Sequence, residues 1–250
     1  MQRAWLIPCV LAFAVTVNAA EVDNVLKEAF SAEAHHDSRR ALVLFRRADA
    51  LRPNDAIILQ KISKQYSDST SYTADPIEKR NLSTSALEYA QRAAALEPHS
   101  AVNVLSVGIC YGKLALLSDT RTKLEYSRLV KQYAEQALVL DPGYAYAHHV
   151  LGRWNYEVAT LGLGPRLMVK LIYGGLPAAS TAEAVKELRR AVELAPTVPA
   201  HRVELGLALL ADGQSVTARE ILVQAVAMPT QEKYDDEAFV RARAALAKLR

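Results

Sequence analysis

Apolar residues recur at spacings of three and four along most of the chain after residue 20, a pattern typical of amphipathic α-helices. Five segments share one ending, in which a small residue, an apolar residue and alanine precede a proline. The endings are Ala41-Phe45-Ala48-Pro53, Ala86-Ala90-Ala93-Pro98, Val130-Ala134-Ala137-Pro142, Ala184-Leu188-Ala191-Pro196 and Ala218-Leu222-Ala225-Pro229. Proline stops a helix because it has no backbone N–H and clashes with the preceding turn. The pattern predicts an all-α chain built from a repeated unit.

A second landmark follows each of the first four prolines at a fixed distance. The pairs are Ile62-Ser63, Val107-Gly108, Leu151-Gly152 and Leu205-Gly206. A small second residue lets two helices cross closely. Both landmarks are typical of the tetratricopeptide repeat, a helix pair with a period of about 34 residues. We therefore predict a tetratricopeptide-repeat solenoid of about five helix pairs.

The proline spacings of 45, 44, 54 and 33 residues show that three repeats carry insertions. The register places each insertion between the two helices of its pair, so that all three emerge on one edge of the solenoid. The first, residues 67–80, is polar and loop-like, and the second, residues 117–125, lengthens the helices around a short turn. The third, residues 160–180, contains an apolar segment, residues 166–173, which predicts a short inserted helix carrying Leu167, Val169, Leu171 and Tyr173.

The two ends of the chain differ from the repeats. An uncharged apolar run, residues 5–17, precedes small residues at Ala19 and Ala20. This layout predicts a secretory signal peptide over residues 1–20, cleaved after Ala19 or Ala20, with an uncleaved anchor as the alternative. The expected location is therefore the periplasm. Residues 21–230 would form the solenoid, and residues 231–250 a C-terminal capping helix that covers its exposed end.

Composition and motifs argue against several classes of function. A net charge of +3, from 30 Lys+Arg and 27 Asp+Glu, does not indicate a nucleic-acid partner. His35-His36 and His148-His149 are adjacent pairs, which point about 100° apart on a helix and form no chelating face. No motif for a nucleophile, a phosphate loop or paired carboxylates is present. The sequence predicts no enzyme activity, no metal site and no cofactor.

A binding surface is the stronger hypothesis. The concave side of such a solenoid is lined by set positions of each first helix, and two tyrosines, a histidine and an arginine are typical of interfaces. The expected binding-groove residues are Tyr146, His149, Arg153, Tyr156 and Glu157, with Lys113 and Lys64 from the preceding repeats. Other groove positions, including Val203, Leu207 and Leu210, are apolar and need a ligand or an internal plug, for which the inserted helix is the candidate. The adjacent Trp154 is expected in the core.

The central repeat also carries a narrower resemblance. The run from Leu151 to Ala159, followed by a Gly-rich insertion and Tyr173-Gly174-Gly175-Leu176-Pro177-Ala178, resembles the regulator of microtubule dynamics family. That resemblance implies inserted repeats, microtubule association and proximity to membranes.

Three functions follow. The first is a non-catalytic scaffold in the cell envelope that binds a protein or peptide in the groove. The second is a carrier of a lipid or another apolar small molecule sheltered under the inserted helix 166–173. The third, from the resemblance alone, is a microtubule-associated protein.

Overall fold

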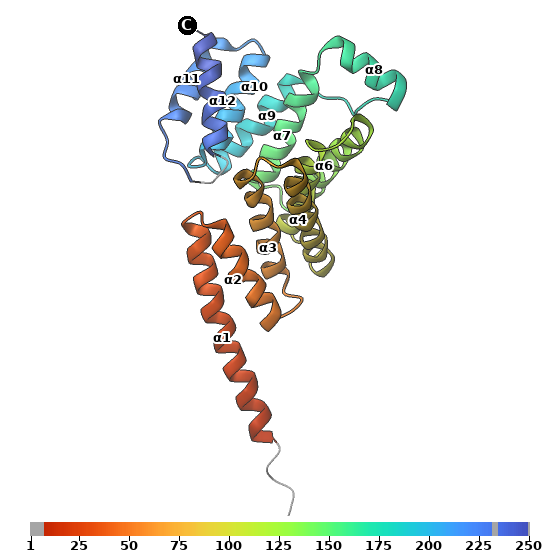
Figure 1. Ribbon diagram of the computed structural model, residues 1–250. Coiled ribbons are helices and arrows are strands. Elements are labelled where there is room, and N and C mark those ends of the chain that lie inside the picture. Colours follow the sequence, from red (N-terminus) through yellow and green to blue (C-terminus); the bar gives the residue numbers. More distant parts are fainter. Residues whose placement is uncertain (1–7, 232–234, 250) are drawn as a thin grey trace, which may run out of the picture.

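The computed structural model describes residues 8–231 and 235–249, without the side chains of residues 8–18, 163, 166 and 173. In this part of the chain all regular structure is helical (Figure 1). The helices are α1 (Pro8–Ala34), α2 (Ser38–Leu51), α3 (Ala56–Ser69), α4 (Pro76–Leu96), α5 (Ala101–Ala115), α6 (Thr120–Leu140), α7 (Ala145–Ala159), α8 (Leu163–Tyr173), α9 (Thr181–Leu194), α10 (Pro199–Ala211), α11 (Ser215–Val226) and α12 (Asp235–Lys248), with a 3₁₀ turn at Thr70–Tyr72.

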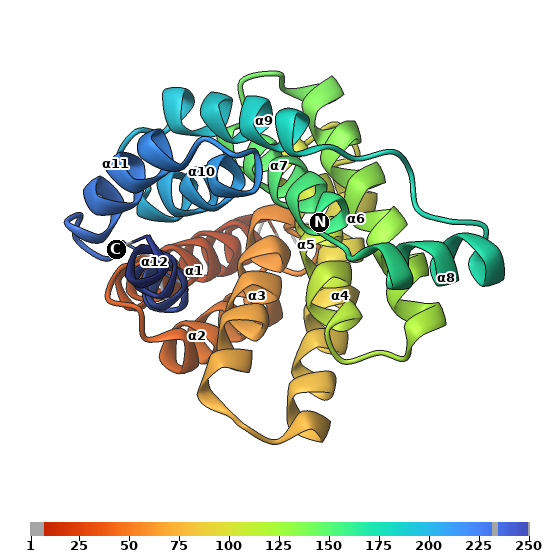
Figure 2. The same cartoon turned by 90° about the horizontal axis from the view of Figure 1, so that it is seen from above.

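Ten of these helices form the five expected pairs: α1 with α2, α3 with α4, α5 with α6, α7 with α9, and α10 with α11. Each pair packs mainly against its neighbours in the chain. Figure 2 shows the pairs following one another around a superhelix, with α3, α5, α7 and α10 on the inner side and α4, α6, α9 and α11 on the outer side. The predicted all-α tetratricopeptide-repeat solenoid is confirmed.

Short-range signals set where the helices begin and end. The Asp55 side chain accepts hydrogen bonds from the N–H groups of Ile57 and Ile58 at 3.0 and 3.1 Å, which caps the start of α3. Aspartate or serine caps α2, α4, α5, α6 and α9 in the same way. Helices α2, α4, α6 and α9 each end two residues before a proline, because the residue before proline is disfavoured in helical conformation.

The Leu-Gly pairs lie where the helices of a pair cross. A Cβ atom on Gly152 would lie 2.6 Å from Leu188 Cγ and 3.1 Å from the Leu188 backbone nitrogen on α9. A Cβ on Gly206 would meet Leu222 at 2.5 Å. Ser63 occupies the corresponding place in α3, is buried, and donates a hydrogen bond to the Ala86 carbonyl of α4 at 2.8 Å.

The substitution Gly152→Ala should lower the free energy of unfolding by about 2 kcal/mol, because overpacking against α9 exceeds the gain in helix propensity. Gly112→Ala is the matched control: it is also mid-helix in a first helix, but its Cβ would meet only Val130 Cγ2 at 3.6 Å. It should stabilise the protein by about 0.5–1 kcal/mol. Urea unfolding followed by circular dichroism measures both, and equal stability changes would contradict the crossing role.

The three insertions connect the two helices of their pairs, as expected. The first is more ordered than predicted, since α3, the 3₁₀ turn and the start of α4 occupy most of residues 67–80. The inserted helix α8 begins at Leu163, three residues before the predicted start. Gly164 and Pro165 therefore lie within its first turn, where proline is tolerated because no N–H partner is needed there.

Helix α8 does not plug the inner side of the solenoid. It projects outward beyond α6 in both views (Figures 1 and 2). Leu167 and Leu171 are exposed and Val169 is half-buried, while the side chain of Tyr173 lies outside the described residues. The predicted plug is therefore wrong. The carrier hypothesis, which needs an apolar space sheltered by this helix, loses its structural basis.

The C-terminal helix covers the apolar inner positions instead. Ala238, Phe239 and Ala242 of α12 pack on Val203 of α10 and on Leu222 and Ala225 of α11. Leu207 and Leu210 of α10 lie at the edge of the same cluster. Helix α12 thus caps the last pair and also fills the inner side there.

At the other end, Val25 and Ala29 of α1 pack against Ala41, Phe45 and Ala48 of α2. The expected cleavage positions Ala19 and Ala20 lie inside α1, and residues 1–7 of the expected signal peptide lie outside the described residues. Among the helices of residues 8–231 and 235–249, none combines the length and apolar character needed to cross a bilayer.

Candidate binding surface on the inner side

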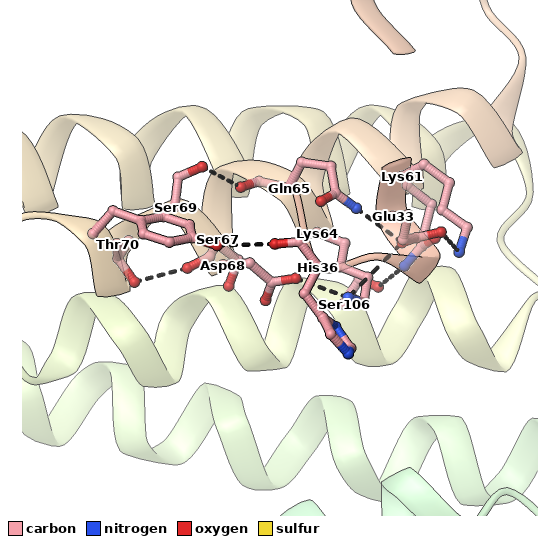
Figure 3. A network of polar contacts seen from close by, with 12 residues as sticks. Glu33, His36, Lys61, Lys64, Gln65, Ser67, Asp68, Ser69, Thr70 and Ser106 are labelled. Carbon is pink, nitrogen blue, oxygen red and sulfur yellow. Dashed lines mark hydrogen bonds and ion pairs between the residues drawn. The ribbon is translucent and has the colours of Figure 1, made fainter. Parts of the chain in front are cut away.

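The predicted groove residues lie in two polar networks, which together we call the inner surface. The first network centres on Glu33 of α1 (Figure 3). Its carboxylate accepts hydrogen bonds from Lys61 at 2.7 Å and from Gln65 at 2.8 Å, and Lys64 lies 3.8 Å away. Lys64 also pairs with Asp68 one turn along α3 at 2.8 Å. The network therefore joins α1 to α3 and fixes the position of Lys64.

Lys113 of α5 reaches the same network from the next repeat. Its ammonium group donates to the Ser67 carbonyl at 2.9 Å and to Thr70 Oγ1 at 3.3 Å. Burial lowers the pKa of Lys113, an effect that the nearby carboxylates of Asp68 and Glu237 oppose. Because these contacts tie Lys113 to the end of α3, its charge is held close to that of Lys64.

The second network joins α7, α10 and α12. Arg153 pairs with Glu157 at 2.9 Å along α7 and lies 3.6 Å from Glu204 of α10. Glu204 is 2% exposed and also accepts a charge-assisted hydrogen bond from Arg241 of α12. The Arg153–Glu157 pair alone stabilises the helix by only about 0.3–0.5 kcal/mol. The buried carboxylate between two arginines is the stronger link, because it fixes three helices relative to one another.

A histidine pair extends this network. His149 Nδ1 of α7 lies 3.0 Å from His201 Nδ1 of α10, so one ring donates a hydrogen bond to the other. The Tyr146 ring packs edge-on against His201 at 5.0 Å between ring centroids. Burial lowers the pKa of each imidazole to about 3; the cations Arg153 and Arg241 add to this for His149, and His149 does so for His201. Both rings are therefore neutral at pH 7.

Helix α12 connects the two networks electrostatically. Its exposed Glu237 acts on the pKa of both Lys113 and Arg153. Burial on its own would lower the pKa of Arg153, but Glu204, Glu157 and Glu237 outweigh it, so that the pKa is raised. The carboxylate of Glu237 thus favours the charged forms of a lysine and an arginine that belong to two different repeats.

The structure therefore brings all seven predicted groove residues to the inner surface. Arg153 and Glu157 are exposed there, and Tyr146, His149, Tyr156, Lys113 and Lys64 are half-buried. Sequence reasoning missed Glu33, His201, Glu204 and Arg241. A signal was present for Glu204, a lone acid within the apolar run Val203–Leu210, opposite a basic residue on the terminal helix.

His148 lies elsewhere, facing α9. Its Nδ1 lies 2.6 Å from Glu187 Oε2 and its Nε2 lies 3.0 Å from the Pro142 carbonyl, so it ties α7 to α9 and to the preceding turn. His35 bonds to the Ser31 carbonyl of its own helix at 2.7 Å. Across the described residues, no group of three or more His, Cys, Asp or Glu is arranged to hold a metal ion.

Solved structures of tetratricopeptide-repeat proteins have the same fold. A thermophilic tetratricopeptide-repeat protein of Thermus thermophilus superposes with a TM-score of 0.64 at 21% identity, over 90% of this chain and 99% of that chain. The pilF protein of Pseudomonas aeruginosa gives a TM-score of 0.55 at 14% identity, over 93% of this chain and 90% of that chain. At these identities the likeness shows the fold alone.

The chain is also similar in sequence to proteins from animals. The chain is 28% identical over 180 residues to regulator of microtubule dynamics protein 3 of Xenopus laevis, covering 72% of this chain and 39% of the frog protein. It is 27% identical over 194 residues to regulator of microtubule dynamics protein 1 of Bos taurus, covering 75% of this chain and 60% of the bovine protein. The chain thus spans about two fifths and three fifths of these relatives.

These relatives overturn the predicted location. The periplasm was expected from the apolar N-terminal run, but the matched proteins come from eukaryotes, whose cells have no periplasm. The prediction of export to the periplasm is wrong.

The family resemblance is confirmed, since the model of regulator of microtubule dynamics proteins 1–3 matches residues 20–250. This chain belongs to the regulator of microtubule dynamics protein 1–3 family.

Proposed function

We propose that this protein is a non-catalytic scaffold that binds a segment of another protein on its inner surface. The observation that carries the proposal is the second network. It presents the exposed Arg153 and the half-buried Tyr156 on α7, which Glu204 of α10 and Arg241 of α12 hold in place. Arginine and tyrosine side chains held in fixed positions are typical anchors of protein interfaces, because little entropy is lost when they bind.

Site-specific crosslinking tests where the partner binds. A photoreactive residue at position 156 should capture one specific protein in cells, whereas the same residue at position 139, which is exposed on the outer helix α6, should not. Equal capture from both positions would place the contact outside the inner surface and contradict the proposal.

The variant Arg153→Ala should then weaken binding of the captured protein by about tenfold or more, as expected when an interface arginine is truncated. Arg190→Ala is the matched control: Arg190 is 49% exposed against 44% for Arg153, and it pairs with a glutamate on its own helix, but it lies on α9. Calorimetry with purified proteins measures both affinities. If the two variants lose the same affinity, Arg153 is not an anchor.

Family membership favours a second candidate, association with microtubules. Co-sedimentation of the purified chain with polymerised tubulin tests it, with Arg153→Ala and Arg190→Ala in parallel. We expect the wild-type chain and Arg190→Ala in the pellet and Arg153→Ala depleted from it. A wild-type chain that stays in the supernatant at micromolar polymer contradicts microtubule association and leaves the crosslinking test to decide on another protein.

A further inference from the structure

Helix α8 exposes a large apolar surface. Leu167, Met168, Leu171 and Ile172 are 58, 54, 75 and 62% exposed. Isolated exposed apolar residues are common on proteins, but four within one short helix form a contiguous patch, which marks an interaction site. The inner surface described above does not include this helix, so the patch calls for a different explanation.

The order of residues in α8 gives this patch a polar border. At about 100° per residue, positions 167, 168, 171 and 172 fall on one arc of the helix, and position 170 lies beside that arc, about 60° from position 167. Lys170 is exposed there, and Arg166 precedes it by one turn in the sequence. From Thr160 to Ala182 the chain contains these two basic residues and no acidic residue. The segment is therefore apolar on one face and positive at its edge.

We propose that α8 is a docking element that lies on the surface of a membrane containing anionic lipids. An apolar face bordered by basic residues is the pattern of helices that bind at the lipid–water boundary. The 11 residues of α8 span about 16 Å, much less than the roughly 30 Å of a hydrocarbon core, so the helix lies in the interface and does not cross it. The positive border matches the negative surface of such a membrane.

The place of α8 in the fold suits this role. It projects from the solenoid in both views (Figures 1 and 2), and its four large apolar side chains are not covered by the repeats. Gly174 and Gly175 follow it with φ angles of 74° and 87°, a left-handed conformation that ends the helix sharply. Arg128 of α6 donates a hydrogen bond to the Gly175 carbonyl, which ties the base of the insertion to the solenoid.

Hydrogen exchange of the full-length chain, measured by mass spectrometry with lipid vesicles, tests the proposal. Vesicles of phosphatidylcholine with phosphatidylserine should slow the exchange of the amides of residues 163–173 by about tenfold, and vesicles of phosphatidylcholine alone should slow it much less. This readout separates α8 from the apolar N-terminal run, which reports in its own peptides. Protection confined to residues before 20, or equal protection by both vesicles, overturns the proposal.

Variants sharpen the test. Leu167→Ser with Leu171→Ser should abolish the protection of α8, and Lys170→Glu should reduce it from about tenfold to about threefold. The matched control is Val139→Ser with Val216→Ser, two valines that are 82 and 77% exposed on the outer helices α6 and α11. It should behave as the wild type. If the control and the α8 variants respond alike, or if all retain protection, α8 does not contact the lipid.

Discussion

Acidification from pH 7 to pH 4 should lower the free energy of unfolding steeply, because of the buried pair His149 and His201. The pKa of each ring is lowered to about 3 in the folded protein, against an ordinary value of 6.5. Below pH 6.5 the unfolded chain therefore binds protons at these positions and the folded chain does not. Their contribution to stability is complete above pH 6.5 and declines as the pH falls toward 3, at about 1.4 kcal/mol per pH unit and histidine.

The surroundings explain why the folded state resists protonation. Arg153 on α7 and Arg241 on α12 disfavour a third positive charge, and Glu204 on α10 already pairs with both arginines. The His201 ring is buried, and its Nε2 has no hydrogen-bond partner among the described residues. A proton added there would be a buried charge beside His149, and this cost exceeds the favourable effect of Glu204, so that protonation favours the unfolded chain.

The double variant His149→Asn with His201→Asn should flatten this pH dependence. Asparagine places a polar atom near the position of Nδ1, which makes the contact between the rings, but it does not titrate. His99→Asn, in the exposed turn before α5, is the control and should leave the profile unchanged. Urea unfolding between pH 4 and pH 7 gives the slopes. Parallel profiles for the wild type and the double variant would show that carboxylates and not this pair set the acid sensitivity.

The positions of the repeats could be predicted from the sequence because two independent patterns indicate them. Pro142 and Leu151-Gly152 come from different physical requirements, the end of one helix and the close crossing of the next pair, and both fix the same register. That register also gave the inner positions such as Arg153 and Lys113. Their side chains lie where the repeat geometry requires, since a helix in a solenoid presents the same face throughout.

The contacts of the terminal helix α12 could not be predicted in this way. Glu204 and Arg241 meet because α12 turns back onto the inner side of α10, and no local periodicity indicates how a terminal helix docks. The sequence also showed that α8 is apolar, but it could not distinguish a helix that fills the inner side from one that projects. In the structure α12 packs on Val203, so the inner side of the last pair is filled by α12 and not by α8.

Trp154→Ala should cause the largest loss of stability of any single substitution considered for α7, about 3–5 kcal/mol. The indole is only 5% exposed, and its Nε1 donates to the carbonyl and hydroxyl oxygens of Ser127 on α6 at 2.8 and 3.0 Å. The Lys131 ammonium lies 5.7 Å from the ring. The residue expected in the core thus joins the third repeat to the fourth, and its removal leaves a cavity at that junction.

Trp154→Phe separates packing from hydrogen bonding. It keeps an aromatic ring at the junction and loses the N–H donor, so its loss should be nearer about 1–2 kcal/mol. Because each repeat contacts mainly its neighbours, hydrogen exchange after Trp154→Ala should increase most in α6 and α7 and least in α2. Arg153 and Tyr156 lie on the same helix, so partner binding should also weaken although neither anchor is changed. A loss below about 1 kcal/mol for Trp154→Ala would instead match a surface residue, and would mean that α7 is positioned mainly by Gly152 against α9.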